Sequence, residues 1–314
     1  MHTGAMSNPI QRPQLIQRPI YGVPPRSHSR LLGLGLAVAL LAGCAAPTSE
    51  ATADEAQRLA AAMRGRAIVM LGEVHDNAAQ HALRAQALAR HLAGGARPAL
   101  LMEMFDRDHQ GDIDRALAGA HADAKAAVEA VIAAGAGGAA GSGWDWRYYR
   151  PYLALAVEHK LPIVAVNVSR ADARRVGTEG LAALGFDAVL PLDLQAAQAA
   201  AIVEGHCGAI DTASARPLVA AQAARDQFMA RAVQTHAERG AVLLLAGNGH
   251  VRRDLGVARW LPPAVRDRSL AVGLLELNTP RIPARAYDLV IETTGQARPD
   301  PCLAFGRVAP DRRP

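Results

Sequence analysis

Lysine and aromatic residues are scarce in this chain of 314 residues. Aromatic side chains make up 4% of it, and lysine occurs only at Lys125 and Lys160. Scarce lysine beside abundant alanine indicates a coding bias and not a design for binding phosphate. Charged residues at 20% and hydrophobic residues at 50% argue against a disordered or fibrous chain, and the length is sufficient for a buried core.

Acidic residues are absent from positions 1–43, and this absence explains most of the net charge of +5. Four arginines lie in the same segment, so the rest of the chain is close to neutral. A nucleic-acid partner requires a basic surface on the folded domain. We therefore expect no nucleic acid among the ligands of this protein.

Residues 31–42 form an apolar, uncharged run that is too short to span a bilayer. A membrane-spanning helix needs about 20 apolar residues. Arg26 and Arg30 precede the run, which is the basic-then-apolar order of a secretory signal. We predict a signal peptide at residues 1–43. The alternative is an uncleaved hydrophobic anchor.

The end of this run, Leu41-Ala42-Gly43-Cys44, resembles a bacterial lipobox, in which the cysteine is lipidated and becomes the first mature residue. The resemblance implies a lipoprotein with palmitate or a similar acyl chain on Cys44. Ala45 follows in place of the aspartate that retains such proteins at the inner membrane. We therefore expect anchoring in the outer membrane, with the domain facing the periplasm and residues 44–56 as its tether.

Only two cysteines remain after Cys44, and they are Cys207 and Cys302. Thiols pair readily in an oxidising compartment such as the periplasm. We predict a Cys207–Cys302 disulfide, against the alternative of unpaired thiols. The bond would hold a C-terminal tail, residues 294–314, that is rich in proline and arginine and otherwise irregular.

Continuous apolar runs alternate with helical stretches in the region 57–293, which we interpret as one domain. Such runs are typical of parallel strands covered on both faces. The pattern predicts an α/β fold with a mainly parallel sheet, helices on both faces, and a helical and glycine-rich insertion at about 106–150. The predicted strands lie at residues 67–71, 99–102, 163–166, 241–246, 270–275 and 289–291.

Polar residues follow these strands, and parallel strands direct such residues to one edge of the sheet. The residues concerned are Glu73, His75, Glu103, Asn167, His250 and Glu276. Two histidines and two carboxylates on one rim can hold a divalent metal or form an acid–base cluster. In a metal-dependent hydrolase, His75, Glu103 and His250 would hold the ion and Glu73 would act as general base on a bound water.

Aromatic residues concentrate in one segment, where residues 144–152 contain five of the eleven that follow Cys44. The cluster indicates a flat apolar ligand or a partner surface, and tyrosine oxygen can ligate ferric haem iron. Arg147 and Arg150 can pair with haem propionates. The alternative is a hydrophobic plug that packs the glycine-rich loop onto the domain.

Two further positions stay open at this stage. His206, beside Cys207, is either a ligand or a surface residue. Arg225 and Asp226 form either a buried ion pair that supports the rim or an ordinary solvated pair.

Several segments together resemble the ChaN-like haem-binding lipoproteins of the Tiki superfamily over roughly residues 60–280. The resemblance implies an α/β fold and haem binding in iron acquisition, more a binding protein than an enzyme. The segments that carry it are Leu71–Asn77, Leu101–Phe105, Trp146–Pro151, Gln222–Ala230 and Ala246–Arg252 with Gly256.

The resemblance also implies roles for single residues. Tyr149 is the best match to the iron ligand of the family because it lies two residues before Pro151, and Tyr148 is the alternative. Trp146, with Trp144, would cover the porphyrin, and His206 or His75 would supply the opposite side. A haem-bridged homodimer and an outer-membrane haem receptor are compatible partners.

The wider superfamily includes metal-dependent proteases and erythromycin-esterase-like hydrolases. Their shared segment is matched by Gly72 to His75, and their acid and late histidine by Glu103 and His250. A protease-like or esterase-like hydrolase is therefore the second reading.

Overall fold

The computed structural model describes residues 49–137, 143–277, 279 and 282–306. The chain divides into two compact units, Met1–Cys44 and Ala45–Pro314, and all described residues belong to the second. The predicted signal peptide, residues 1–43, and the predicted lipidation site, Cys44, lie outside the described residues.

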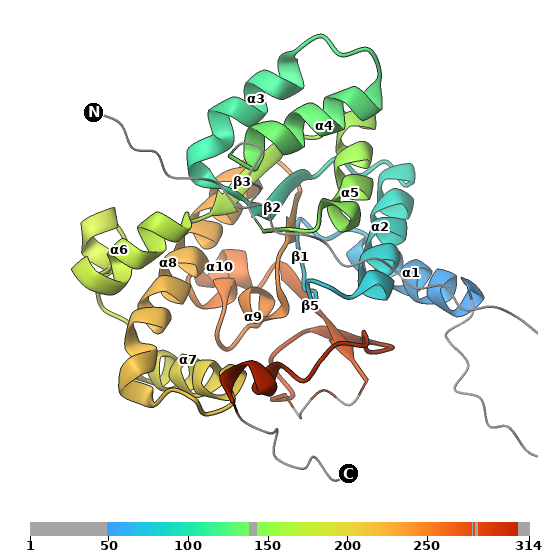
Figure 1. Ribbon diagram of the computed structural model, residues 1–314. Helices are drawn as coiled ribbons and strands as arrows, with labels where there is room; N and C mark the ends of the chain where they lie inside the picture. Colours follow the sequence, from blue (N-terminus) through green and yellow to red (C-terminus); the bar gives the residue numbers. More distant parts are fainter. Residues whose placement is uncertain (1–48, 138–142, 278, 280–281, 307–314) are drawn as a thin grey trace, which may run out of the picture. The chain divides into compact units, whose positions relative to one another are not determined.

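The described strands form one six-stranded parallel sheet in the order β3-β2-β4-β1-β5-β6 (Figure 1). Every strand predicted from an apolar run is present. Their bounds are β1 Ile68–Leu71, β2 Ala99–Asp106, β3 Ile163–Asn167, β4 Val242–Leu245, β5 Ser269–Glu276 and β6 Leu289–Thr293.

Ten α-helices connect and cover these strands within the described part of the chain. They are α1 Ser49–Met63, α2 Ala78–Ala93, α3 Gln110–Ala118, α4 Ala124–Gly135, α5 Trp146–Glu158, α6 Arg170–Glu179, α7 Leu192–Gly205, α8 Thr212–Ala237, α9 Asn248–Val251 and α10 Pro263–Arg266. Four short 3-10 helices accompany them: η1 Arg107–His109, η2 Leu181–Leu184, η3 Val257–Arg259 and η4 Pro301–Phe305. Among the described helices, none is long and apolar enough to cross a membrane.

Helices cover both faces of the sheet, as predicted, and the side chains of β1 show how. Val69 and Leu71 pack into the core beneath α1, α2, α4 and α5, whereas Ile68 and Met70 pack on the other side, against α8 and η3. Alternate residues of a strand point to opposite faces, so a strand buried on both faces must be apolar at every position. The sheet therefore has a hydrophobic core on each face. Because its strands are parallel, their carboxyl-terminal ends lie along one edge of the sheet.

Two of the expected segments differ from their description in the sequence analysis. Residues 49–56 of the predicted tether form the first half of α1, and Ala56 and Leu59 of this helix are buried in the core. The predicted insertion at about 106–150 comprises η1, α3, α4 and the start of α5, and Ile113 and Val131 join the same core. Both segments are therefore part of the domain, because their apolar side chains are buried in its core.

The predicted disulfide is confirmed. Cys207 and Cys302 are bonded, with their Cα atoms 5.5 Å apart. The bond holds η4, so part of the tail predicted at 294–314 is ordered against the turn after α7.

Candidate functional site

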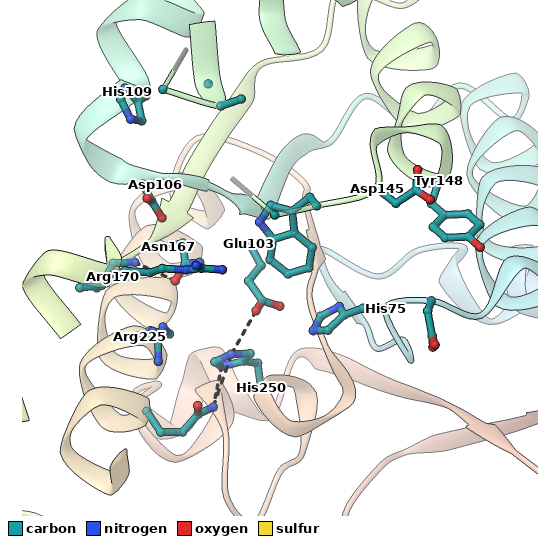
Figure 2. Close-up of a pocket in the computed structure, with 18 residues that line it drawn as sticks. His75, Glu103, Asp106, His109, Asp145, Tyr148, Asn167, Arg170, Arg225 and His250 are labelled. Atoms are coloured by element: carbon teal, nitrogen blue, oxygen red, sulfur yellow. Dashed lines mark hydrogen bonds and ion pairs between the residues drawn. The ribbon is translucent and has the colours of Figure 1, made fainter. Parts of the chain in front are cut away.

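Four of the six polar residues predicted to follow the strands, His75, Glu103, Asn167 and His250, line one cavity of about 900 Å³. Glu73 is buried behind His75, and Glu276 is bound to Arg298 and Asn77 outside the lining. The cavity lies at the carboxyl-terminal ends of β1 to β4, where α/β sheets bind their ligands. Figure 2 shows side chains from both sides of the sheet pointing into it. The titratable residues of its lining are His75, Asp76, Glu103, Asp106, His109, Asp145, Tyr148, Arg170, Arg225 and His250, and Asn167 and Gln222 add side-chain amides.

His250 lies at the floor of the cavity between two buried carboxylates. Its Nδ1 is 2.6 Å from Oδ1 of Asp226, and its Nε2 is 3.4 Å from Oε1 of Glu103. Burial alone would lower the pKa of His250, but Glu103 and Asp226 outweigh burial and raise it to about 10. His250 is therefore an imidazolium at neutral pH, and both of its ring nitrogens carry protons.

Glu103 is held as the anion. Burial would raise the pKa of its carboxyl, but the charge of His250 and the backbone N–H of Gly247, which donates to Oε2 at 2.6 Å, lower it to about 2. Arg225 and Asp226 form neither the buried nor the solvated pair considered from the sequence: the carboxylate of Asp226 is bound by His250, and Arg225 lines the cavity.

A second buried carboxylate, Glu73, orients His75. Oε1 of Glu73 is 2.8 Å from Nδ1 of His75, and Arg84 forms an ion pair with Oε2. Burial would raise the pKa of Glu73, but Arg84 and then His75 outweigh it and lower the pKa. Since Nδ1 faces Glu73, Nε2 of His75 is the nitrogen left for the cavity.

Gly247 makes room for this ring. A Cβ at position 247 would lie 2.9 Å from Nε2 of His75, so any side chain there would displace the imidazole. The glycine that follows β4 is therefore needed for a close approach between two strand ends.

The described residues include no group of three or more His, Cys, Asp or Glu side chains placed to hold a metal ion. The prediction that His75, Glu103 and His250 form a metal site is therefore not supported. The ring of His250 is instead engaged by the protein itself, with Nδ1 2.6 Å from Asp226 and Nε2 3.4 Å from Glu103. The metal-dependent hydrolase hypothesis therefore lacks support for the metal site on which it depends.

The aromatic segment 144–152 divides between the core and the cavity. Tyr149 and Tyr152 are fully buried, and Trp146 stacks on Phe105 with ring centroids 5.1 Å apart. These residues do pack α5 onto the domain, as the hydrophobic-plug alternative proposed. Trp144 and Tyr148 instead line the cavity.

The rings of Trp144 and Tyr148 are held by histidines. Trp144 meets the ring of His75 edge-on, with centroids 4.8 Å apart. Tyr148 stacks on His81 at 4.6 Å, with the planes 6° apart. The cavity therefore presents one indole and one phenol beside His75.

The structure does not bring the other predicted haem-binding residues to this cavity. The guanidinium of Arg150 binds Glu129, and that of Arg147 binds Asp145. His206 lies at the end of α7, beside the disulfide, where its Nδ1 is 2.7 Å from the carbonyl oxygen of Ile202. None of these three side chains is part of the cavity lining.

Sequence reasoning missed one cationic residue of the lining, Arg170. It follows β3 by three residues, so the rule that found Asn167 would have found it had the search gone one turn further. Arg225, within α8, was considered only as a partner of Asp226, and its place in the cavity lining was not expected.

The family model described as haem-binding uptake, Tiki superfamily, ChaN matches residues 59–261 of this chain. A search of the curated proteins finds no match to the sequence. Among solved structures, one described as cofacial heme binding to ChaN of Campylobacter jejuni is 17% identical with a TM-score of 0.57, and the match covers 74% of this chain and 90% of that one. This similarity shows a shared fold.

Two further structures are more distant. An erythromycin esterase is 14% identical with a TM-score of 0.41 and matches 71% of this chain and 73% of its own. A protein from Bacillus cereus is 12% identical with a TM-score of 0.32 and matches 72% of this chain and 75% of its own. The family match spans most of the domain, and the chain therefore belongs to the ChaN family of haem-binding uptake proteins in the Tiki superfamily.

Proposed function

We propose that this protein binds haem in the cavity at the strand ends and that the phenol oxygen of Tyr148 is the iron ligand. The observation that carries the proposal is the position of Tyr148: among the described residues, it is the tyrosine that lines the cavity. Haem, when bound, would supply a ferric iron, and the phenolate oxygen of Tyr148 would hold it. Membership of the ChaN family supports haem as the ligand.

Tyr149, preferred over Tyr148 from the sequence, is less suited to this role. Its side chain is fully buried, and its hydroxyl donates a hydrogen bond to Oε1 of Glu73 at 2.5 Å. Burial, and then the negative charge of Glu73, raise the pKa of the Tyr149 phenol far above its ordinary value. A ligand that must be both accessible and deprotonated is disfavoured on both counts.

The cavity fits a large planar ligand. Its volume of about 900 Å³ lies near the upper end of small-molecule sites, at about 300–1,000 Å³. Trp144 and Tyr148 offer aromatic rings beside His75 for contact with a porphyrin.

We further propose that the protein is a lipoprotein anchored through Cys44 in the outer membrane, faces the periplasm and serves haem or iron uptake. The basic-then-apolar order of residues 26–42 and the segment ending at Cys44 support the anchor. The solved ChaN of Campylobacter jejuni is described as binding heme cofacially, which supports a homodimer that holds haem between two copies. An outer-membrane haem receptor is the partner that fits this location.

Hemin titration of the chain from Ala45 onward, followed by the Soret band, tests the haem proposal. We expect saturable binding by the wild type, loss of the tyrosinate-type spectrum in Tyr148→Phe, and retention of that spectrum in Tyr149→Phe. No saturable shift in the wild type would refute haem binding. An unchanged spectrum in Tyr148→Phe would refute the assignment of the ligand.

The anchor is tested separately, in cells that express the full chain. We expect labelled palmitate to be incorporated into the wild type and not into Cys44→Ala. Equal labelling of the two proteins would contradict lipidation at this residue.

A further inference from the structure

The side chains of two arginines in the cavity lining, Arg170 and Arg225, form no hydrogen bond or ion pair with any residue that the structure describes. Other arginines of the domain behave differently: Arg84, Arg107 and Arg150 are each bound to a carboxylate. Arg225 is half-buried on α8, so its charge is partly removed from water without a compensating protein anion. A guanidinium in that situation is available to an anionic ligand.

The two guanidinium groups lie on the same side of the cavity. In Figure 2, Arg170 and Arg225 project into it from one wall, with Asn167 beside them, whereas His75 and Tyr148 lie on the opposite side. The Oδ1 of Asn167 accepts a hydrogen bond from the backbone N–H of Val168 at 2.9 Å. Its Nδ2 has no partner among the described residues and is a further donor for an acceptor in the cavity.

One carboxylate shares this end of the cavity. Asp106 on β2 is the sheet partner of Asn167 on β3, and its carboxylate interacts electrostatically with both arginines. Its side chain forms no hydrogen bond or ion pair with any described residue. The remaining carboxylate of the floor, Glu103, is bound by Gly247 and His250. Two cations therefore face one free carboxylate, which leaves a positive charge at this end.

The cavity is thus polarised along its length. One end offers the phenol of Tyr148 and the imidazole of His75, and the other offers two guanidinium groups and an amide. A guanidinium binds a carboxylate through two parallel hydrogen bonds, which fixes the orientation as well as the charge of the ligand.

We propose that Arg170 and Arg225, with the amide of Asn167, form the carboxylate-binding end of the cavity and take the two propionates of the tetrapyrrole. This inference rests on the proposed function. It replaces Arg147 and Arg150, whose guanidinium groups are already bound by Asp145 and Glu129. The carboxylates of the ligand, and not only its iron, then set its orientation.

The test uses metal-free protoporphyrin IX and its dimethyl ester, with quenching of tryptophan fluorescence as the readout. Neither compound has iron, so the bond to Tyr148 plays no part in the comparison. We expect the wild type to bind the diacid about tenfold or more tightly than the diester, because charge-assisted hydrogen bonds of this kind are each worth at least that factor. The double variant Arg170→Gln/Arg225→Gln should bind the two compounds equally.

The matched control is Arg147→Gln/Arg150→Gln, which removes the same total charge from side chains outside the cavity lining. It should keep the preference for the diacid. The single variant Arg170→Gln changes an exposed side chain, so it is expected to fold, and it should lower the preference by itself. Thermal unfolding of each variant verifies the fold.

The outcomes separate the two proposals. Equal binding of diacid and diester by the wild type, or a preference that survives Arg170→Gln/Arg225→Gln, would overturn the carboxylate site while leaving hemin binding through Tyr148 intact. Failure of the wild type to bind hemin as well as both porphyrins would overturn the proposed function itself. A preference lost equally in the control variant would reduce the effect to general charge and would also overturn the site.

Discussion

The hydroxyl of Tyr149 donates a hydrogen bond of 2.5 Å to Oε1 of Glu73, the same oxygen that faces Nδ1 of His75. Tyr149 is not in the cavity lining, and its hydroxyl reaches the cavity through Glu73 and His75. Glu73 is fully buried, and Arg84 neutralises its charge from the opposite oxygen. This arrangement makes Tyr149 part of the support for His75 and a contributor to stability.

Replacement of Tyr149 by Phe should lower the free energy of unfolding by about 1.5–3 kcal/mol, because a hydrogen bond to a buried charged group is lost. Urea unfolding measures the change. The matched control is Tyr287→Phe, whose hydroxyl donates to the neutral carbonyl oxygen of Asn248 at 3.0 Å and should cost about 0.5–1.5 kcal/mol. If Tyr149→Phe lowers the free energy of unfolding by no more than this control, the hydrogen bond to Glu73 is no more stabilising than one to a neutral acceptor.

The strands could be predicted from the sequence because parallel strands buried on both faces leave a continuous apolar run. β1 and β4 are apolar and buried at every position, and both were found. The strand order could not be predicted. β4 lies between β1 and β2 although a long helical region, α6 to α8, separates it from β3 in the chain. Such long-range pairing leaves no periodic signal.

The sequence predicted which residues lie at the rim of the site, but not their charge states or hydrogen-bond partners. Glu103 and His250 follow buried strands, so their convergence was expected and is confirmed. The charge state of His250 depends on Asp226, which comes from the middle of α8. No local pattern connects a helix position to a strand end that it meets only after folding.

The choice between Tyr148 and Tyr149 also exceeds what the sequence contains. Neighbours on an α-helix point about 100° apart, so one can line a cavity while the other packs into the core. A shift of one position in the assumed helix register exchanges the two roles. The assignment of the iron ligand stays a prediction until the hemin titration is made.

The stability contributed by His250 should depend on pH in the alkaline range. Its pKa is about 10 in the folded protein against 6.5 for an ordinary histidine. The folded state therefore holds the proton more tightly, so this contribution is fully present below pH 6.5 and is lost as the pH rises towards 10. The difference in unfolding free energy between the wild type and His250→Gln should shrink across this window.

Urea unfolding at intervals from pH 6.5 to 10 measures that difference. The control is His91→Gln, since burial lowers the pKa of His91, so above about pH 7.5 this residue is neutral in both states. The difference for His91→Gln should stay constant above that pH. A constant difference for His250→Gln as well would mean that Glu103 and Asp226 do not hold its proton.

The disulfide should stabilise the domain without affecting the cavity. Cys207 and Cys302 are 95 positions apart, so their bond constrains a long loop of the unfolded chain, and the double variant Cys207→Ala/Cys302→Ala should lose about 2–5 kcal/mol. Hemin affinity should remain within about twofold, since neither cysteine lines the cavity. A reducing agent should lower the midpoint of urea unfolding of the wild type and leave that of the double variant unchanged. A parallel loss of hemin affinity would instead place the turn after α7, or η4, in contact with the ligand.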